Sequence, residues 1–129
     1  MILVDSSVWV DYFNGIISRE TDLLDEKIST TPILIGDLIL IEVLQGFKKD
    51  KDYKKAKGLF SQFIHVELGG FEIANKSADN YRKLRKKGVT IRKTIDMIIA
   101  SYCIENNVTL LHADKDFQPM EKLLGLITI

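Results

Sequence analysis

Four acidic residues lie beside apolar segments, where a solvated surface would not place them: Asp5, Glu42, Asp96 and Asp114. Glu42 is the hardest of these to explain as a surface residue. It follows Ile39-Leu40-Ile41, and no Lys or Arg stands three or four residues away on either side. A buried carboxylate is costly unless it is paired or binds a metal. The sequence therefore predicts a functional role for Glu42.

The other three acids each have an ordinary structural explanation. Asp5 could cap the helix that follows it, and Asp96 would interact favourably with the first turn of a helix. Asp114 and Asp116 could both form turns. These explanations do not account for the shared position of the acids near predicted strand ends and helix starts, where open α/β sheets bind ligands. We expect the four acids to converge, with Asp114 a better ligand than Asp116.

Converging carboxylates repel one another, and their pKa values rise unless a cation is bound among them. Mg²⁺ and Mn²⁺ favour oxygen ligands and would relieve this repulsion. Zinc is disfavoured, because Cys103 lies in a predicted core helix and His65 and His112 are the only histidines. The acids therefore predict a Mg²⁺ or Mn²⁺ site.

Short apolar strands alternate with helices along the 129 residues. Apolar runs predict strands at 2–4, 33–35, 64–66, 109–111 and 126–129. Helices are expected from Ser6 or Ser7 to Gly15 and at about 18–29, 38–47, 51–63, 71–87 and 95–106, with a short one after the turn at 113–116. Asp37 and Thr94 are candidate N-caps. The alternation predicts one α/β domain over residues 1–129, with a mostly parallel sheet covered on both faces.

The formal net charge of zero hides a segregated pattern. Residues 76–93 carry eight basic residues and one acid, and residues 48–57 carry six basic residues and two acids. This distribution predicts an electropositive face, although charged helices can also be merely solvated. The composition excludes intrinsic disorder and a disulfide framework. Because we find no signal peptide and no membrane span, we expect a cytoplasmic protein.

The chemistry-bearing residues also carry a family resemblance. Val4-Asp5-Ser6-Ser7-Val8-Trp9 at the start, a lone Glu42, Asp96 opening a helix, and Asp114-Lys115-Asp116-Phe117 resemble the PIN-domain nucleases. The size and motif order are most similar to the VapC toxins of prokaryotic VapBC toxin–antitoxin pairs. The resemblance covers essentially the whole chain, and the set of motifs in this order is more specific than any one of them.

This resemblance implies a three-layer α/β/α fold with a parallel sheet of four or five strands and a metal-dependent endoribonuclease that leaves a 5′-phosphate. Matched by position, the metal-binding catalytic acids are Asp5, Glu42, Asp96 and Asp114. Ser6 or Ser7 matches a small polar residue that hydrogen-bonds within the acidic site, and Asp116 matches an accessory acid. The implied partners are RNA, an antitoxin protein and a second copy of the chain.

On this interpretation the basic segments hold the RNA backbone, with contacts expected from Arg85, Lys86, Lys87, Arg92 and Lys93. Arg92 and Lys93 are close to Asp96 in sequence, so we expect them to touch phosphate near the scissile bond. An apolar face formed by Val8, Trp9, Tyr12 and Phe13 beside the helix from Leu38 would receive the antitoxin, unless all four side chains face the core. A basic residue of the antitoxin would then pair with the acids.

Two other functions compete with this hypothesis. A non-catalytic RNA-binding or regulatory module could use the same fold, although such a module would be expected to have lost acids. A phospho-receiver domain also places Asp at strand ends. It would need a phospho-accepting Asp after a middle strand and a Lys after the last one, a signature that we do not find.

Overall fold

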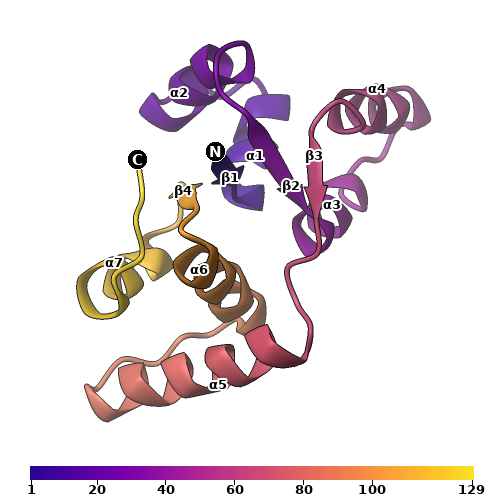
Figure 1. The fold of residues 1–129 in the computed structure, drawn as a ribbon. Coiled ribbons are helices and arrows are strands. Elements are labelled where there is room, and N and C mark those ends of the chain that lie inside the picture. The colour runs from indigo at the N-terminus through magenta and orange to yellow at the C-terminus, as the bar shows by residue number, and fades with distance from the viewer.

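The computed structural model describes residues 1–129 as an alternation of short strands and helices (Figure 1). In order, the elements are β1 (Ile2–Val4), α1 (Ser6–Phe13), α2 (Arg19–Ile28), β2 (Ile33–Gly36), α3 (Asp37–Leu44), α4 (Asp50–Phe60), β3 (Ile64–Val66), α5 (Phe71–Lys86), α6 (Thr94–Asn106), β4 (Thr109–Leu111), the 3₁₀ turn η1 (Lys115–Phe117) and α7 (Gln118–Leu124).

The strands form a four-stranded sheet in the order β3-β2-β1-β4, and every pair is parallel. Leu3 of β1 pairs with Leu34 on one side and with Leu110 on the other. The predicted strand at 126–129 is reduced to one bridge between Leu110 and Thr128. Its backbone hydrogen bonds to β4 are both made by Leu110. The mostly parallel sheet is confirmed.

Helices cover both faces of the sheet and make three layers, as predicted (Figure 1). The chain winds outward from β1 to β2 and β3 through α1–α4, and then crosses to the other side of β1 through α5 and α6 to reach β4. The winding direction therefore reverses between β1 and β4. Such a switch point opens a crevice at the carboxyl ends of its two strands, where α/β proteins bind ligands.

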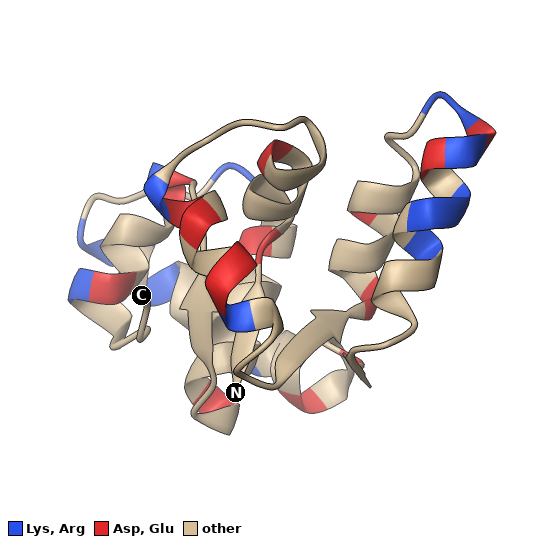
Figure 2. Ribbon diagram, turned by 90° about the horizontal axis from the view of Figure 1, so that it is seen from above, with Lys and Arg blue, Asp and Glu red and all other residues tan.

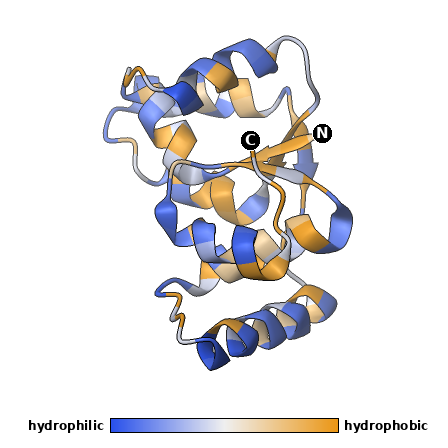
Figure 3. Cartoon of the chain, turned by 90° about the vertical axis from the view of Figure 1, so that its left-hand side faces the viewer, coloured by the Kyte–Doolittle hydropathy of each residue, from blue (hydrophilic) through white to orange (hydrophobic).

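The core contains 26 buried apolar residues in one cluster. β1, β2 and β4 contribute most of their length to it, whereas the edge strand β3 contributes no fully buried residue. In Figure 3 the sheet lies between helices whose outer sides are hydrophilic. Trp9 is fully buried and stacks on Phe13 at a ring-centroid distance of 5.9 Å. Cys103 is also buried, which leaves it as a small core residue. No helix is both long and apolar enough to cross a membrane.

Two helix starts differ from the prediction, and one agrees with it. α1 begins at Ser6 with Asp5 as its N-cap, which is the structural role expected for Asp5. Gly36 is the N-cap of α3, because Asp37 already has helical geometry and its Oδ1 accepts from the backbone N–H of Leu68, 3.1 Å away. Lys93 precedes α6 in place of Thr94. The tertiary contact at Asp37 shows why cap preference alone misplaced that helix start.

Two helix ends and one burial expectation also need correction. The helix expected at 38–47 ends at Leu44, and the one expected at 51–63 spans Asp50–Phe60. The first of these is not buried all round: only Ile39 and Val43 are buried, whereas Ile41 is 57% exposed. The apolar helix that carries Glu42 therefore has an open side.

Candidate metal centre

Asp5 sits at the end of β1, on the sheet edge where the winding direction reverses. Its side chain is buried, and its Oδ2 accepts from the backbone N–H of Ser7 at 3.0 Å and from the Ser7 hydroxyl at 2.6 Å. The Ser7 Oγ in turn accepts from the backbone N–H of Ala113 at 3.1 Å. Ser7 therefore joins the segment after β1 to the segment after β4 and orients Asp5 between them.

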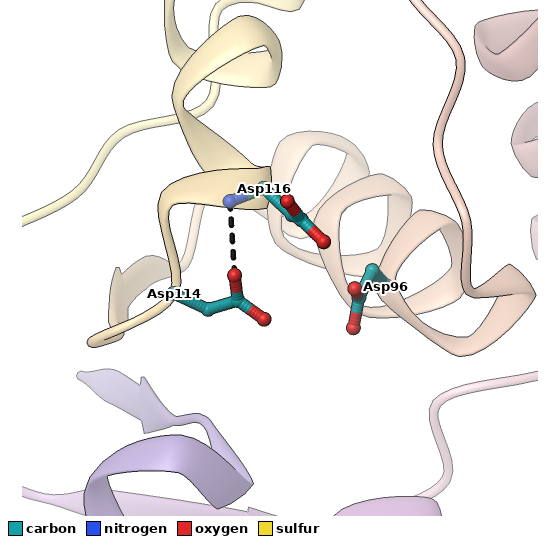
Figure 4. A group of neighbouring side chains, drawn as sticks. All are labelled: Asp96, Asp114 and Asp116. Atoms are coloured by element: carbon teal, nitrogen blue, oxygen red, sulfur yellow. Dashed lines mark hydrogen bonds between the residues drawn. The ribbon is translucent and has the colours of Figure 1, made fainter.

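Three aspartates from α6 and η1 converge beside this edge (Figure 4). One carboxylate oxygen from each of Asp96, Asp114 and Asp116 lies within 4.8 Å of the others. We call these residues the aspartate cluster. Asp114 Oδ1 accepts from the backbone N–H of Asp116 at 2.9 Å, which fixes the turn that carries both. Asp116 therefore lies in one group with Asp96 and Asp114.

Glu42 reaches toward this group from α3. Its Oε1 is buried and has no hydrogen-bond partner. Burial raises the pKa of Glu42, a hydrogen bond with the Ser6 side chain lowers it, and the nearby Asp5 raises it. A small polar side chain that hydrogen-bonds within the acidic site is present as Ser7 at Asp5.

Asp96 is the electrostatic centre of the site. It is 3% exposed, and burial raises its pKa from 3.8 to about 6. Lys93 opposes this shift, whereas the charges of Asp5, Asp114 and Glu42 add to it. The four acids singled out in the sequence therefore act on one another in the folded chain.

Two basic residues face the aspartate cluster. Lys93 Nζ lies 3.5 Å from Asp114 Oδ2 and 3.7 Å from Asp96 Oδ2. Arg92 Nη2 donates to Asp116 Oδ2 at 2.9 Å. The sequence placed these cations near phosphate, but it did not indicate that they would pair with the acids. The sequence shows only that both residues stand close to Asp96. The ion pairs with Asp114 and Asp116 join residues more than twenty positions apart, so no local pattern predicts them.

The donor set fits a hard divalent cation. Glu42 Oε1 and Asp96 Oδ2 are both buried without a hydrogen-bond partner, which is costly for carboxylate oxygens. The remaining donors are also carboxylates, and their summed negative charge exceeds that of the two facing cations. Oxygen-only ligation of this kind suits Mg²⁺ or Mn²⁺.

The remaining basic residues singled out in the sequence lie at the end of α5, whereas His112 lies beside the aspartate cluster. Arg85, Lys86 and Lys87 are exposed around the carboxyl end of α5, and the chain then runs back along the loop of 88–93 to the start of α6 (Figure 1). His112 Nδ1 accepts from the backbone N–H of Asp114, and its Nε2 lies 3.5 Å from Glu121 Oε1. His112 therefore supports the turn after β4.

Comparison with known proteins places this geometry in a family. Residues 2–123 match the PIN domain. The chain is 28% identical over 130 residues to VapC ribonuclease Mb1587 of Mycobacterium bovis, covering 98% of this chain and 96% of that protein. Ribonuclease VapC11 of Mycobacterium tuberculosis matches with the same identity and coverage.

Solved structures share the fold at lower sequence identity. The structure of VapBC2 from Rickettsia felis bound to a promoter DNA fragment aligns with a TM-score of 0.77 and 21% identity, covering 100% of this chain and 98% of the other. A toxin–antitoxin complex from Klebsiella pneumoniae aligns with a TM-score of 0.73 and 21% identity, covering 99% and 97%. These alignments extend over the whole sheet and both helical layers.

Proposed function

The chain belongs to the PIN-domain family, and from that membership we propose that it is a metal-dependent endoribonuclease and the toxin of a VapBC-type toxin–antitoxin pair. The observation that carries the proposal is the aspartate cluster, whose carboxylate oxygens lie within 4.8 Å of one another, together with the buried Glu42 Oε1 and Asp96 Oδ2, which have no hydrogen-bond partner. The ribonuclease names of its relatives support the choice of RNA as substrate.

Each acid has a proposed role. Asp5, Asp96 and Asp114 hold Mg²⁺ or Mn²⁺, and Asp116 adds charge beside them. Glu42, whose Oε1 is buried, completes the site or orients the attacking water. Ser7 keeps the Asp5 carboxylate turned toward the site through its 2.6 Å hydrogen bond.

A divalent cation held by these acids would activate water as a nucleophile at neutral pH and would neutralise charge on the phosphate and the leaving oxygen. Arg92 and Lys93 bind the phosphates that flank the scissile bond, and Arg85, Lys86 and Lys87 hold the backbone farther away. Cleavage releases the 3′ oxygen and leaves a 5′-phosphate.

The proposed partner is an antitoxin that covers the apolar side of the site and inserts a basic residue among the acids. That residue would pair with the carboxylates and compete with Mg²⁺. The structural neighbours, which are described as VapBC and toxin–antitoxin assemblies, support such a partner. We also propose that the toxin forms a homodimer and acts in the cytoplasm. A small neighbouring open reading frame for a DNA-binding antitoxin would support the pairing.

The test is cleavage of total cellular RNA with Mg²⁺ and with a chelator. The unaltered protein should cleave only with metal, and Asp5→Asn or Asp96→Asn should abolish cleavage while circular dichroism shows a folded chain. Asp79→Asn is the matched control, because Asp79 is exposed on α5. Full Mg²⁺-dependent activity in either site variant would refute the assignment, and RNA binding without any cleavage would favour the non-catalytic module.

A further inference from the structure

A continuous groove leads away from Glu42 between the carboxyl ends of α1 and α3. Its inner part is a cavity of about 120 Å³ whose lining includes Glu42 and Val10. The inner part shares Phe13, Asn14, Gly46 and Phe47 with an outer cavity of about 450 Å³. The outer volume lies within the range of about 300–1,000 Å³ that is typical of ligand pockets.

The groove has an aromatic wall and a basic mouth. Phe13 and Phe47 are half-buried, and their ring centroids lie 5.4 Å apart at an interplanar angle of 75°. The mouth is lined by Lys48, Lys49 and Lys55, with Asp52 as the single acid. We call this whole feature the lysine groove. It combines flat apolar surface with positive charge and opens at one end on a candidate catalytic acid.

The lysines of this region divide into two sets on the folded chain. Lys48, Lys49 and Lys55 line the groove, whereas Lys51, Lys54 and Lys57 are exposed on the same segment but do not line it. Lys57 instead lies over the ring of Tyr53 at 5.6 Å. Figure 2 shows basic residues on α4 and on the loop beside it, at the right of the view. Three of the six lysines of residues 48–57 therefore line the groove.

We propose that the lysine groove is a subsite for single-stranded RNA, in which one unpaired base stacks on Phe47 and the lysines bind the phosphates that follow it. This inference rests on the proposed ribonuclease function. Aromatic faces that stack bases and lysines that track the backbone are the two components of single-strand binding sites. Because the groove meets the site at Glu42, a strand bound there runs from the metal centre toward α4.

The charge arm of the test measures binding of a fluorescein-labelled oligouridine by anisotropy, in chelator and over a salt series. The triple variant K48A/K49A/K55A should flatten the salt slope by up to about two log units per log unit of salt, at roughly 0.7 for each lost contact. The matched variant K51A/K54A/K57A removes the same charge from the same segment and should leave the slope nearly unchanged. Equal effects of the two triple variants would overturn the proposal.

The stacking arm uses Phe47→Leu, which keeps an apolar side chain without a flat ring. Its affinity for the oligouridine should fall about fivefold or more at an unchanged salt slope. Unchanged affinity in a variant that melts like the parent would overturn the stacked base. Since binding is measured without metal, loss of cleavage alone would count against the proposed ribonuclease. A protein that cleaves RNA but gives equal slopes for both triple variants would count against the groove alone.

Discussion

At the scale of single residues, burial of Asp96 controls how the stability of the metal-free protein depends on pH. Its pKa rises from 3.8 to about 6 on folding. The folded chain therefore binds more protons at this group than the unfolded chain between those values, so stability falls as pH rises through that window. Above about pH 6 Asp96 is ionised in both states, and the full free-energy cost of burying its charge is present.

Asp96→Asn should therefore stabilise the metal-free protein at pH 7 by up to about 3 kcal/mol, the equivalent of this pKa shift. Thermal or urea unfolding in chelator at several pH values measures the effect. The gain should shrink as pH falls from about 6 toward 4. Asp79→Asn, on an exposed position of α5, should show no such trend. A pH-independent gain in Asp96→Asn would contradict the electrostatic explanation.

Lys93 is the second residue whose environment leads to a prediction. Its ammonium lies 3.5 Å from Asp114 and 3.7 Å from Asp96, so a divalent cation must share these carboxylates with it. Lys93→Met should tighten Mn²⁺ binding by about tenfold, because a like charge leaves the site. The same variant should bind RNA more weakly, because a phosphate partner is lost.

Isothermal titration with Mn²⁺ measures the first effect directly. Lys115→Met is the control, because Lys115 is exposed beside Asp114 in the sequence and makes no ion pair. It should change metal affinity much less. Weaker Mn²⁺ binding in Lys93→Met than in the unaltered protein would mean that Lys93 supports the metal site instead of competing with it.

At the scale of elements, the junction of β2 and α3 depends on close packing at Gly36. A Cβ placed there would lie 2.4 Å from the Cδ1 of Leu68, which is fully buried. Gly36→Ala should therefore destabilise the fold by about 1–3 kcal/mol, as overpacked core substitutions do. Gly58 offers the opposite case within α4, since nothing lies within 4 Å of the position that a Cβ would occupy there.

Gly58→Ala should stabilise the protein by about 0.5–1 kcal/mol, because Ala is the better helix former. Urea unfolding of the two variants side by side separates packing from helix propensity. If Gly36→Ala were as stable as Gly58→Ala, Leu68 would have to move freely at that junction, and the hydrogen bond from its N–H to Asp37 would not hold the loop after β3.

The sequence predicted the order of strands and helices well, because β1, β2 and β4 contain short apolar runs and α2, α4 and α5 separate an apolar face from a polar one. It placed helix starts less well. Asp37 bonds to Leu68, which is 31 positions away, and no local cap rule contains that contact. The acids were identifiable because an apolar context makes a carboxylate conspicuous. The pairing of Arg92 with Asp116 and the separation of the lysines around the groove depend on tertiary geometry.

At the scale of the whole molecule, exposed apolar residues lie next to the proposed site. The expected apolar face is wrong in detail, because Val8 and Trp9 are fully buried. The side chains that remain open nearby are Val10, 43% exposed on α1, and Ile41, 57% exposed on α3. Val10 shares the lining of the inner groove with Glu42. A partner that covers these residues would reach the acids and the mouth of the groove together.

If the proposed antitoxin binds across this face, Ile41→Gln should weaken its inhibition of RNA cleavage by about tenfold, because burial of an Ile side chain contributes about 1.5–3 kcal/mol. Phe71→Gln is the matched control, since Phe71 is 88% exposed at the start of α5, on the other face of the sheet. Titration of purified antitoxin into each active variant measures the change.

Inhibition should also weaken as the Mg²⁺ concentration rises, because a basic residue inserted by the antitoxin and the metal compete for the same carboxylates. Unchanged inhibition of Ile41→Gln would place the antitoxin on another surface, and inhibition independent of Mg²⁺ would mean that it blocks RNA without entering the acidic site.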